Sequence, residues 1–165
     1  TAPIENLYNE NKKLIDKTSR RYFLVINPKK ITIKDAQKLK VKAPLHPDHN
    51  YGNRIFETND EFYIQDELIK NKIYRFMHLF NFKNNKFVSK DYDKELNAIM
   101  LHWLPVSKNL VKVNVLMEDG KHINGLGEKD LSKVKVNDVV QFERNFFARL
   151  DKKSKNELIF WYAHK

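Results

Sequence analysis

Short runs of β-type residues, separated by turn residues, fill the chain after its first twenty or so residues and constrain its fold more than any other feature. The predicted strands cover residues 22–26, 31–33, 39–41, 62–64, 73–82, 86–88, 99–104, 111–117, 134–136, 139–150 and 158–163. Many short strands with few helices favour closed or nearly closed barrels, because closure leaves no edge strand unpaired. We therefore expect an all-β fold built from barrels.

Turn chemistry separates these runs. Asn84-Asn85 and Asp119-Gly120 match the residue preferences of two-residue hairpin loops. Residues 44–54, P-L-H-P-D-H-N-Y-G-N-R, contain two prolines and a glycine and are predicted to form a loop. Residues 64–71 and 93–98 are each expected to form a short helical turn.

At the beginning of the chain, apolar residues recur with the spacing of a helix and not of a strand. Apolar residues at positions 4, 7, 8, 14 and 15 lie opposite charged and amide residues, which predicts an amphipathic helix over residues 3–18. Pro3 suits the first turn of this helix, and Lys17 places positive charge near its C-terminal end.

Composition favours an anionic partner. The 165 residues carry 31 Lys and Arg against 21 Asp and Glu, a formal net charge of +10, which attracts polyanions. Nucleic acid is the leading class of partner and an anionic membrane the second. No apolar run approaches the about 20 residues of a membrane-spanning helix, and the start has no signal-peptide pattern. Without cysteine, the chain has no disulfides or thiolate metal ligands.

Residues 139–151, V-V-Q-F-E-R-N-F-F-A-R-L-D, combine amide, guanidinium and aromatic side chains in one predicted strand. An unpaired base offers a face for stacking and polar edges for hydrogen bonds, so Gln141 and Arg144 are candidate base contacts. The alternative is an ordinary half-buried strand with Phe142 and Phe146 in a barrel core.

The sequence contains little that indicates enzyme chemistry. It has no phosphate-binding glycine loop, since its four glycines lack the required spacing. His46 and His49, with Asp48, are more simply explained as residues of the 44–54 loop than as metal ligands. His102 lies in an apolar segment and is expected in the core. We predict no catalytic, cofactor or metal site on this chain.

Four segments, taken in order, resemble the anticodon-binding region of class I glutamyl-tRNA synthetases of the archaeal and eukaryotic kind, which are related to the glutaminyl enzymes. They are E-N-K-K-L-I-D-K-T-S-R-R-Y-F (10–23), A-P-L-H-P-D-H (43–49) followed by G-N-R (52–54), I-M-L-H-W-L-P (99–105), and the 139–151 segment with F-W-Y-A-H-K (160–165). The resemblance extends over nearly the whole chain.

The resemblance implies two packed β-barrels that bind the anticodon arm. Residues 1–21 would be a helical connector from a catalytic part absent from this chain, and residues 22–165 would form the two barrels. The H-I-G-H and K-M-S-K-S signatures of the catalytic half are missing, because H-I-N-G (122–125) and K-T-S-R-R (17–21) lie in the wrong context. ATP and Mg²⁺ are therefore expected only in the catalytic domain, and not on this fragment.

The resemblance also implies a set of anticodon-binding residues. Gln141 and Arg144 match positions that contact anticodon bases in the glutaminyl relatives. Arg21 matches an arginine at the start of the first barrel strand. Arg75 resembles an arginine in the barrel formed by the middle of the chain. Arg54 and Arg149 are weaker candidates, and Glu143 is expected to orient an arginine or to face the other side of its strand.

The implied partner is the tRNA for glutamate, with the tRNA for glutamine as a further possibility, and we expect a cytoplasmic monomer that does not bind membranes. Three lysines, Lys112, Lys133 and Lys135, are candidate phosphate contacts. Two other classes of function stay open: a general RNA-binding β-barrel module, and a protein-interaction domain whose charge only keeps the chain soluble.

Overall fold

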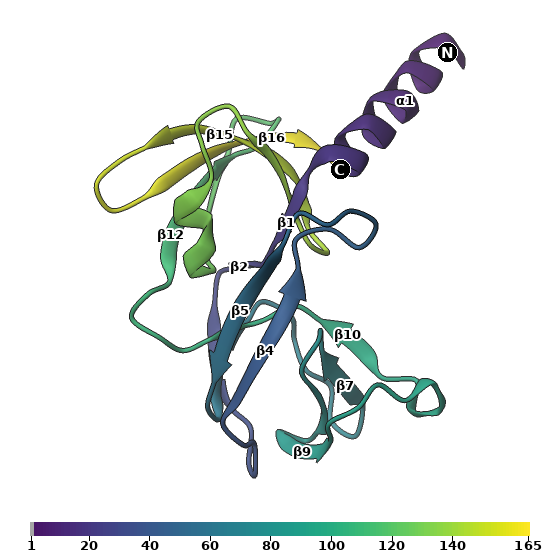
Figure 1. Cartoon of the computed structure of the whole chain (residues 1–165), viewed down its shortest axis with the longest axis vertical. Helices are drawn as coiled ribbons and strands as arrows, with labels where there is room; N and C mark the ends of the chain where they lie inside the picture. The colour runs from purple at the N-terminus through teal and green to yellow at the C-terminus, as the bar shows by residue number, and fades with distance from the viewer. Residues whose placement is uncertain (1) are drawn as a thin grey trace.

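The structure, a computed structural model, describes the backbone of residues 2–165 and the side chains of residues 7–165. One helix, α1 (Ala2–Thr18), extends away from a body made of strands (Figure 1). The first nine strands are β1 (Arg20–Tyr22), β2 (Leu24–Ile26), β3 (Lys29–Thr32), β4 (Leu39–Pro44), β5 (Asn53–Thr58), β6 (Glu61–Ile64), β7 (Ile73–Phe76), β8 (Phe80–Lys83) and β9 (Lys86–Ser89). The others are β10 (Ile99–Leu101), β11 (Leu104–Pro105), β12 (Val111–Leu116), β13 (His122–Gly127), β14 (Val139–Phe142), β15 (Phe146–Lys153) and β16 (Leu158–His164), with 3₁₀ turns η1 (Lys94–Leu96) and η2 (Lys129–Lys133).

A seven-stranded sheet forms the first barrel, which lies on the upper left in Figure 1. Its strand order is β1-β14-β15-β16-β12-β13-β2, so its two edge strands are consecutive in the chain and are separated only by Phe23. The sheet therefore nearly closes on itself, and its interior holds an apolar core that includes Val115, Phe142, Phe146 and Phe160.

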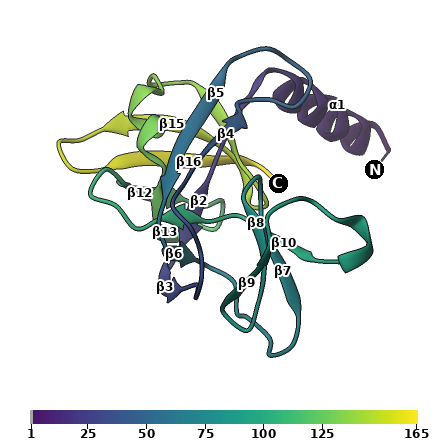
Figure 2. The same cartoon turned by 60° about the horizontal axis from the view of Figure 1, so that its bottom comes forward.

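Three smaller sheets form the second barrel from the chain between β2 and β12. Their strand orders are β10-β7-β8-β9, β11-β6-β3 and β4-β5. In Figure 2, β3, β7, β9 and β10 lie in the lower part of the molecule, while β4 and β5 extend upward beside the first barrel. These sheets form a partial barrel around a second core rich in aromatic residues, among them Phe62, Phe76, Phe80 and Trp103, none of which is exposed.

One stretch of strand is a wall of both barrels. Successive side chains of an extended strand point to opposite faces. Tyr22 and Leu24 accordingly pack in the first core, while Phe23 and Val25 pack in the second. An all-β fold of packed barrels after a helix is thus confirmed, and this shared wall holds the barrels together.

The predicted helix is confirmed, but much of its apolar stripe is not buried. Pro3 and Ile4 lie outside the described side chains, and Leu7 and Leu14 are largely exposed. The helix contacts the first barrel where the Tyr8 ring packs on His164, with 4.0 Å between the ring centroids. No helix in the described part of the chain is long and apolar enough to cross a membrane.

The predicted turns at Asn84-Asn85 and Asp119-Gly120 are confirmed. Asn84 and Asn85 have φ of 49° and 57°, the left-handed conformation that asparagine tolerates. The Met117 N–H donates to the carbonyl of Lys121 across the Asp119-Gly120 turn.

Two predicted strands are wrong in the same way, because each is a hairpin. Residues 73–82 divide into β7 and β8 at a turn where His78 has φ of 66°. Residues 139–150 divide between β14 and β15 at a turn where Arg144 has φ of 63°. Neither turn contains glycine or proline, and Asn145 in the second is the one conventional turn residue of the two, so the turn signal is weak at both places.

Other boundaries also differ from the prediction. Strands β5 and β13 are absent from the predicted set, the predicted strand at residues 134–136 is not a strand, and residues 64–71 are not helical. Strand β13 contains Gly125 and Gly127, which weaken the β signal in its sequence. At residues 93–98 the expected helical turn is present as η1.

Candidate nucleic-acid interface

Pairing between β1 and β14 places Arg21 directly beside Gln141. The two strands are parallel, and these residues are register partners although they come from opposite ends of the sequence. Two of the four predicted site residues therefore meet on the wall of the first barrel. The sequence predicted both residues, but their adjacency depends on the tertiary strand pairing.

Each side chain of this pair has one buried polar atom without a hydrogen-bond partner. Among the residues whose side chains are described, four buried side-chain atoms have no hydrogen-bond partner: Arg21 Nε, Thr58 Oγ1, His102 Nε2 and Gln141 Oε1. Buried polar atoms are usually hydrogen-bonded, so an unsatisfied donor and an unsatisfied acceptor on neighbouring strands indicate a place where a ligand supplies the partners.

The surroundings of Arg21 fix its position. Its Nη2 lies 3.4 Å from the Asp16 Oδ1 near the end of α1. Its backbone N–H donates to the carbonyl of Leu45, in the loop between β4 and β5. The helix end and this loop therefore hold the arginine from both sides, and its side chain keeps 26% of its surface exposed.

The loop between β4 and β5 is the P-L-H-P segment and is ordered by its histidines. The Asp48 N–H donates to His46 Nδ1, so His46 Nε2 carries the proton and donates to the carbonyl of Asp16 at 2.7 Å. Both ring nitrogens are thus used in holding the loop against α1. The described residues contain no group of three or more His, Asp or Glu side chains placed to bind a metal ion.

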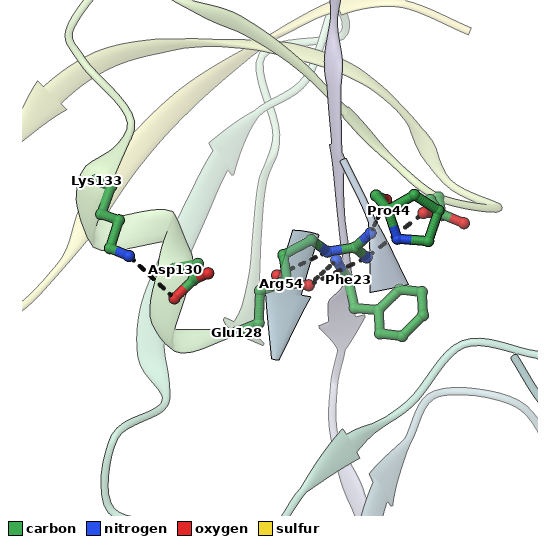
Figure 3. A network of polar contacts seen from close by, with 7 residues as sticks. Phe23, Pro44, Arg54, Glu128, Asp130 and Lys133 are labelled. Atoms are coloured by element: carbon green, nitrogen blue, oxygen red, sulfur yellow. Dashed lines mark hydrogen bonds and ion pairs between the residues drawn. The ribbon is translucent and has the colours of Figure 1, made fainter. Parts of the chain in front are cut away.

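Arg54 is buried between the barrels (Figure 3), with 1% of its side chain exposed. Its Nε donates to Glu128 Oε1 at 3.0 Å, and its Nη2 lies 3.4 Å from Glu143 Oε1. Its guanidinium carbon lies 5.0 Å from the centroid of the Phe23 ring. Glu128 also accepts the backbone N–H of Phe23 at 2.7 Å, so this network holds the junction of β1 and β2. Arg54 has no exposed edge to offer RNA.

The two carboxylates of this network share one guanidinium. Burial raises the pKa of Glu128 to about 7, and Arg54 with the Phe23 N–H opposes the rise. Burial likewise raises the pKa of Glu143, opposed by Arg54 and then by Arg21. Glu143 therefore lies in the field of the predicted base-contacting arginine, consistent with the expectation that it orients an arginine.

Arg144 lies in the turn after β14 and ties the first barrel to the second. Its Nη1 and Nη2 each donate to one carboxylate oxygen of Asp66 at 3.1 Å, a bidentate pair. Nη1 also lies 2.9 Å from Nδ1 of His102, which accepts. Burial and then the charge of Arg144 lower the pKa of His102 to about 4, so the imidazole is neutral.

The same turn makes a second inter-barrel contact through Asn145. Its amide nitrogen donates to the carbonyl of Leu24 at 2.9 Å, and its oxygen accepts from Gln65 Nε2 at 2.8 Å. Gln65 Oε1 in turn accepts the backbone N–H of Ile26 at 3.0 Å. The turn is thus a built junction that keeps the barrels in one relative position.

Arg75 lies on the outer face of the second barrel beneath the loop after β9. Its Nη1 donates to Asn81 Oδ1 at 3.1 Å and to the carbonyl of Lys90 at 3.0 Å. Its guanidinium carbon lies 5.8 Å from the centroid of Tyr92, whose ring is largely exposed. Desolvation lowers the pKa of Arg75. The structure thus places Arg75 on a different sheet from Arg21 and Gln141.

Arg149 and the predicted phosphate contacts lie on the surface of the first barrel. Arg149 stacks on Trp161, with its guanidinium carbon 5.0 Å from the ring centroid, and its Nη1 donates to Asn137. The three predicted phosphate contacts, Lys112, Lys133 and Lys135, are all exposed, and Lys133 lies 3.8 Å from an Asp130 oxygen.

Comparison with known proteins agrees with this architecture. The family described as "tRNA synthetases class I (E and Q), anti-codon binding domain" matches residues 19–103, a little over half of the 165 residues. The chain belongs to this family. The matched range of this anticodon-binding domain begins just before the β1 strand with Arg21 and ends at Trp103, and it includes every strand of the second barrel except β11.

Curated relatives align with almost the entire chain. It is 44% identical to a glutamate–tRNA ligase of Methanocaldococcus jannaschii, 40% to one of Methanococcus maripaludis strain C6 and 38% to one of Methanobrevibacter smithii. Each alignment covers 98% of this chain but only 30–31% of the relative. The chain thus spans about a third of the length of the relatives it matches, and the suspected family resemblance is confirmed.

Sequence patterns missed several residues of this interface. Asp66, Gln65 and Asn145 hold the inter-barrel junction. Gln65 and Asp66 stand in a segment without a recognisable motif, and Asn145 lies in the 139–151 segment but was not among its candidate residues. Thr58 lies on β5, a strand absent from the prediction. Burial alternates along β5, with Arg54, Phe56 and Thr58 buried, but Ile55 is exposed and Arg54 is charged, so the sequence lacks the apolar alternation that identifies a strand.

Proposed function

We propose that this chain is the anticodon-binding region of a glutamate–tRNA ligase. It binds the anticodon arm and discriminates its bases, while a catalytic domain outside this chain aminoacylates the tRNA. The observation that carries the proposal is the Arg21–Gln141 pair, two register partners in which Arg21 Nε–H and Gln141 Oε1 are buried and have no hydrogen-bond partner within the protein.

This pair suits the edge of an unpaired base. Bases present mixed donors and acceptors on their edges, and specific RNA recognition mainly targets unpaired bases with amide and guanidinium groups. Arg21 Nε–H donates to a base acceptor and Gln141 Oε1 accepts from a base amino or imino group. Asp16 holds the other end of the Arg21 guanidinium, so the donor is oriented before RNA binds.

Arg144 and Arg75 complete the proposed set with different roles. Arg144 uses both Nη atoms within the protein, which leaves Nε–H and one Nη2 hydrogen for RNA. Arg75 spends its Nη1 hydrogens on Asn81 and Lys90 and supports the exposed ring of Tyr92. We therefore assign base selection first to Arg21 and Gln141, then to Arg144, and give Arg75 a supporting position.

The proposal extends to the context of the chain. Residues 1–21 act as the connector and residues 22–165 as the anticodon-binding region. The partner is the tRNA for glutamate, and the tRNA for glutamine is a second possible partner. The protein works as a cytoplasmic monomer. ATP and Mg²⁺ act in the catalytic domain. Exposed lysines supply phosphate contacts, which make binding depend on salt.

The test is affinity for anticodon stem-loops. We expect the chain to bind the stem-loop of the glutamate tRNA more tightly than stem-loops with one changed anticodon base. Gln141→Ala should lower affinity for the cognate stem-loop by roughly 5- to 100-fold and reduce discrimination at one position, because a specific base contact is lost. Filter binding at several salt concentrations measures both effects.

Lys112→Ala is the matched control, since loss of a phosphate contact weakens all stem-loops equally and reduces the salt slope. Equal affinity for every anticodon would contradict the proposal and favour a general RNA-binding module. Binding of no RNA at all would favour the protein-interaction alternative. A stem-loop of the glutamine tRNA in the same assay separates the two possible partners.

A further inference from the structure

A cavity of about 550 Å³ lies between the barrels, away from the Arg21–Gln141 pair. Its walls come from the start of β4, the end of β5, residues 105–110 and the chain just after β13, with Leu39, Phe56, Pro105 and Leu110 as apolar lining. The β4–β5 hairpin connects the two places. Its Pro44–Asn53 end adjoins the loop held by Arg21, and its Leu39–Thr58 end forms the cavity. Six-residue strands separate these ends by about 17 Å.

An unsatisfied hydroxyl lies in the wall of this cavity. Thr58 is 3% exposed, and its Oγ1 has no hydrogen-bond partner. Burial of an unpaired hydroxyl is unfavourable, and a valine of nearly the same shape would avoid the cost. The hydroxyl therefore indicates a ligand that supplies the missing hydrogen bond.

The charges around the cavity favour an anionic ligand. Lys38, Lys40 and Lys129 contribute to its lining and are exposed. Of the two lining carboxylates, Glu128 is already held by Arg54 and the Phe23 N–H, which leaves Glu57 against the three lysines. Lysine charge thus exceeds unpaired carboxylate charge at the opening.

We propose that this cavity binds one unstacked nucleotide of the same RNA, a step that rests on the proposed function. The base lies against Phe56 and Leu110 and hydrogen-bonds Thr58 Oγ1, while the phosphate contacts the lysines at the opening. A ligand with a flat apolar body, polar edges and one anionic group matches all three features. The volume lies within the range of about 300–1,000 Å³ that is typical of small-ligand sites.

The test uses the full chain and the four ribonucleoside 5′-monophosphates as probes. In a backbone amide NMR titration, we expect saturable shifts at Leu39, Phe56 and Leu110 with at least one nucleotide. Thr58→Val should weaken that binding roughly five-fold, the effect of one hydrogen bond. Its thermal midpoint should stay equal or rise, because the variant removes an unpaired hydroxyl.

Thr32→Val, an exposed threonine on β3, is the matched control and should leave nucleotide affinity unchanged. The proposal is overturned if the nucleotides shift only amides near Arg21 and Gln141, or if Thr58→Val binds them as wild type does. It is also overturned if a polyglutamate peptide shifts the cavity amides and no nucleotide does, since the site is then a peptide site.

The stem-loop assay keeps this proposal separate from the proposed function. If the cavity binds no nucleotide but the protein still discriminates anticodons, only the cavity proposal is overturned. Nucleotide binding in the cavity without anticodon discrimination contradicts the proposed function and supports a cavity that serves general RNA binding.

Discussion

Glu128 and Glu143 share the single guanidinium of Arg54, so the buried network carries one more negative than positive charge when both carboxylates ionise. A buried surplus charge is costly, and a group can avoid the cost by keeping a proton. Burial accordingly raises the pKa of both carboxylates. The network lies at Phe23, where β1 meets β2, so its protonation bears on the stability of both barrels.

We predict that Glu128 makes folding stability fall as pH rises. Its pKa in the folded protein is about 7, against an ordinary 4.5, so the folded state holds the proton more strongly. The resulting stabilisation is fully present below pH 4.5 and is lost as the pH rises through about 7. By linkage it amounts to at most about 3 kcal/mol. Urea unfolding of wild type and Glu128→Gln across this range measures the difference in unfolding free energy.

The comparison with Glu128→Gln is needed because the contribution of His102 to folding stability changes with pH in the opposite direction. Its folded pKa is lowered to about 4, so its stabilising contribution is present above its ordinary 6.5 and is lost as pH falls through about 4. Glu57→Gln, an exposed carboxylate on β5, serves as the control. A pH-independent difference between wild type and Glu128→Gln would contradict the prediction.

Strand β13 closes the first barrel by packing unusually close to β2. A Cβ at Gly125 would lie 2.5 Å from the backbone oxygen of Val25, a contact that only a shift of backbone could relieve. Glycine is therefore needed at this position for close approach of the two strands. The same requirement explains the glycine in the H-I-N-G segment, which is a strand feature and not a remnant of a nucleotide-binding motif.

We expect Gly125→Ala to lower the free energy of unfolding by about 1–3 kcal/mol, the usual cost of overpacking. Gly120→Asn is the control, because Gly120 has open space around its Cβ position and asparagine tolerates its positive φ of 84°. Chemical unfolding of both variants checks the prediction. Similar losses in the two variants would show that the β2–β13 approach is not the sensitive contact.

The molecule as a whole depends on a strand that belongs to both barrels. Tyr22 and Leu24 fill one core while Phe23 and Val25 fill the other, and the Arg144–Asp66 and Asn145–Gln65 contacts join the barrels a second time. Neither barrel can lose this strand without exposing the other core. A fixed relation between the barrels also keeps the Arg21–Gln141 pair and the Thr58 cavity at a constant separation.

This coupling predicts a single unfolding transition for both barrels. The two tryptophans report on them separately, since Trp103 is buried in the second core and Trp161 lies on β16 of the first barrel. In Trp161→Phe, fluorescence of Trp103 follows the second barrel alone. A second substitution, Val115→Ala, creates a cavity in the first core. It should lower the unfolding midpoint measured by Trp103 fluorescence as much as the midpoint measured by far-UV circular dichroism. An unchanged Trp103 midpoint would show that the barrels unfold independently.

The sequence by itself determined the local features of this protein. Side-chain periodicity and turn chemistry predicted the helix, the β-rich fold, a loop within residues 44–54 and the placement of Phe142 and Phe146 in the core, where both are buried. These features follow from side-chain periodicity and preferred backbone angles, which neighbouring residues encode. The candidate residues Arg21 and Gln141 also came from the sequence, through resemblance.

Only the tertiary structure decided what those residues can do. It paired Arg21 with Gln141 across the parallel β1–β14 contact, buried Arg54 against Glu128, and placed Arg144 in a turn facing Asp66. It also left Thr58 Oγ1 unsatisfied in a cavity. Strand partners, register and burial are set by contacts between segments far apart in the chain, and no local pattern encodes them.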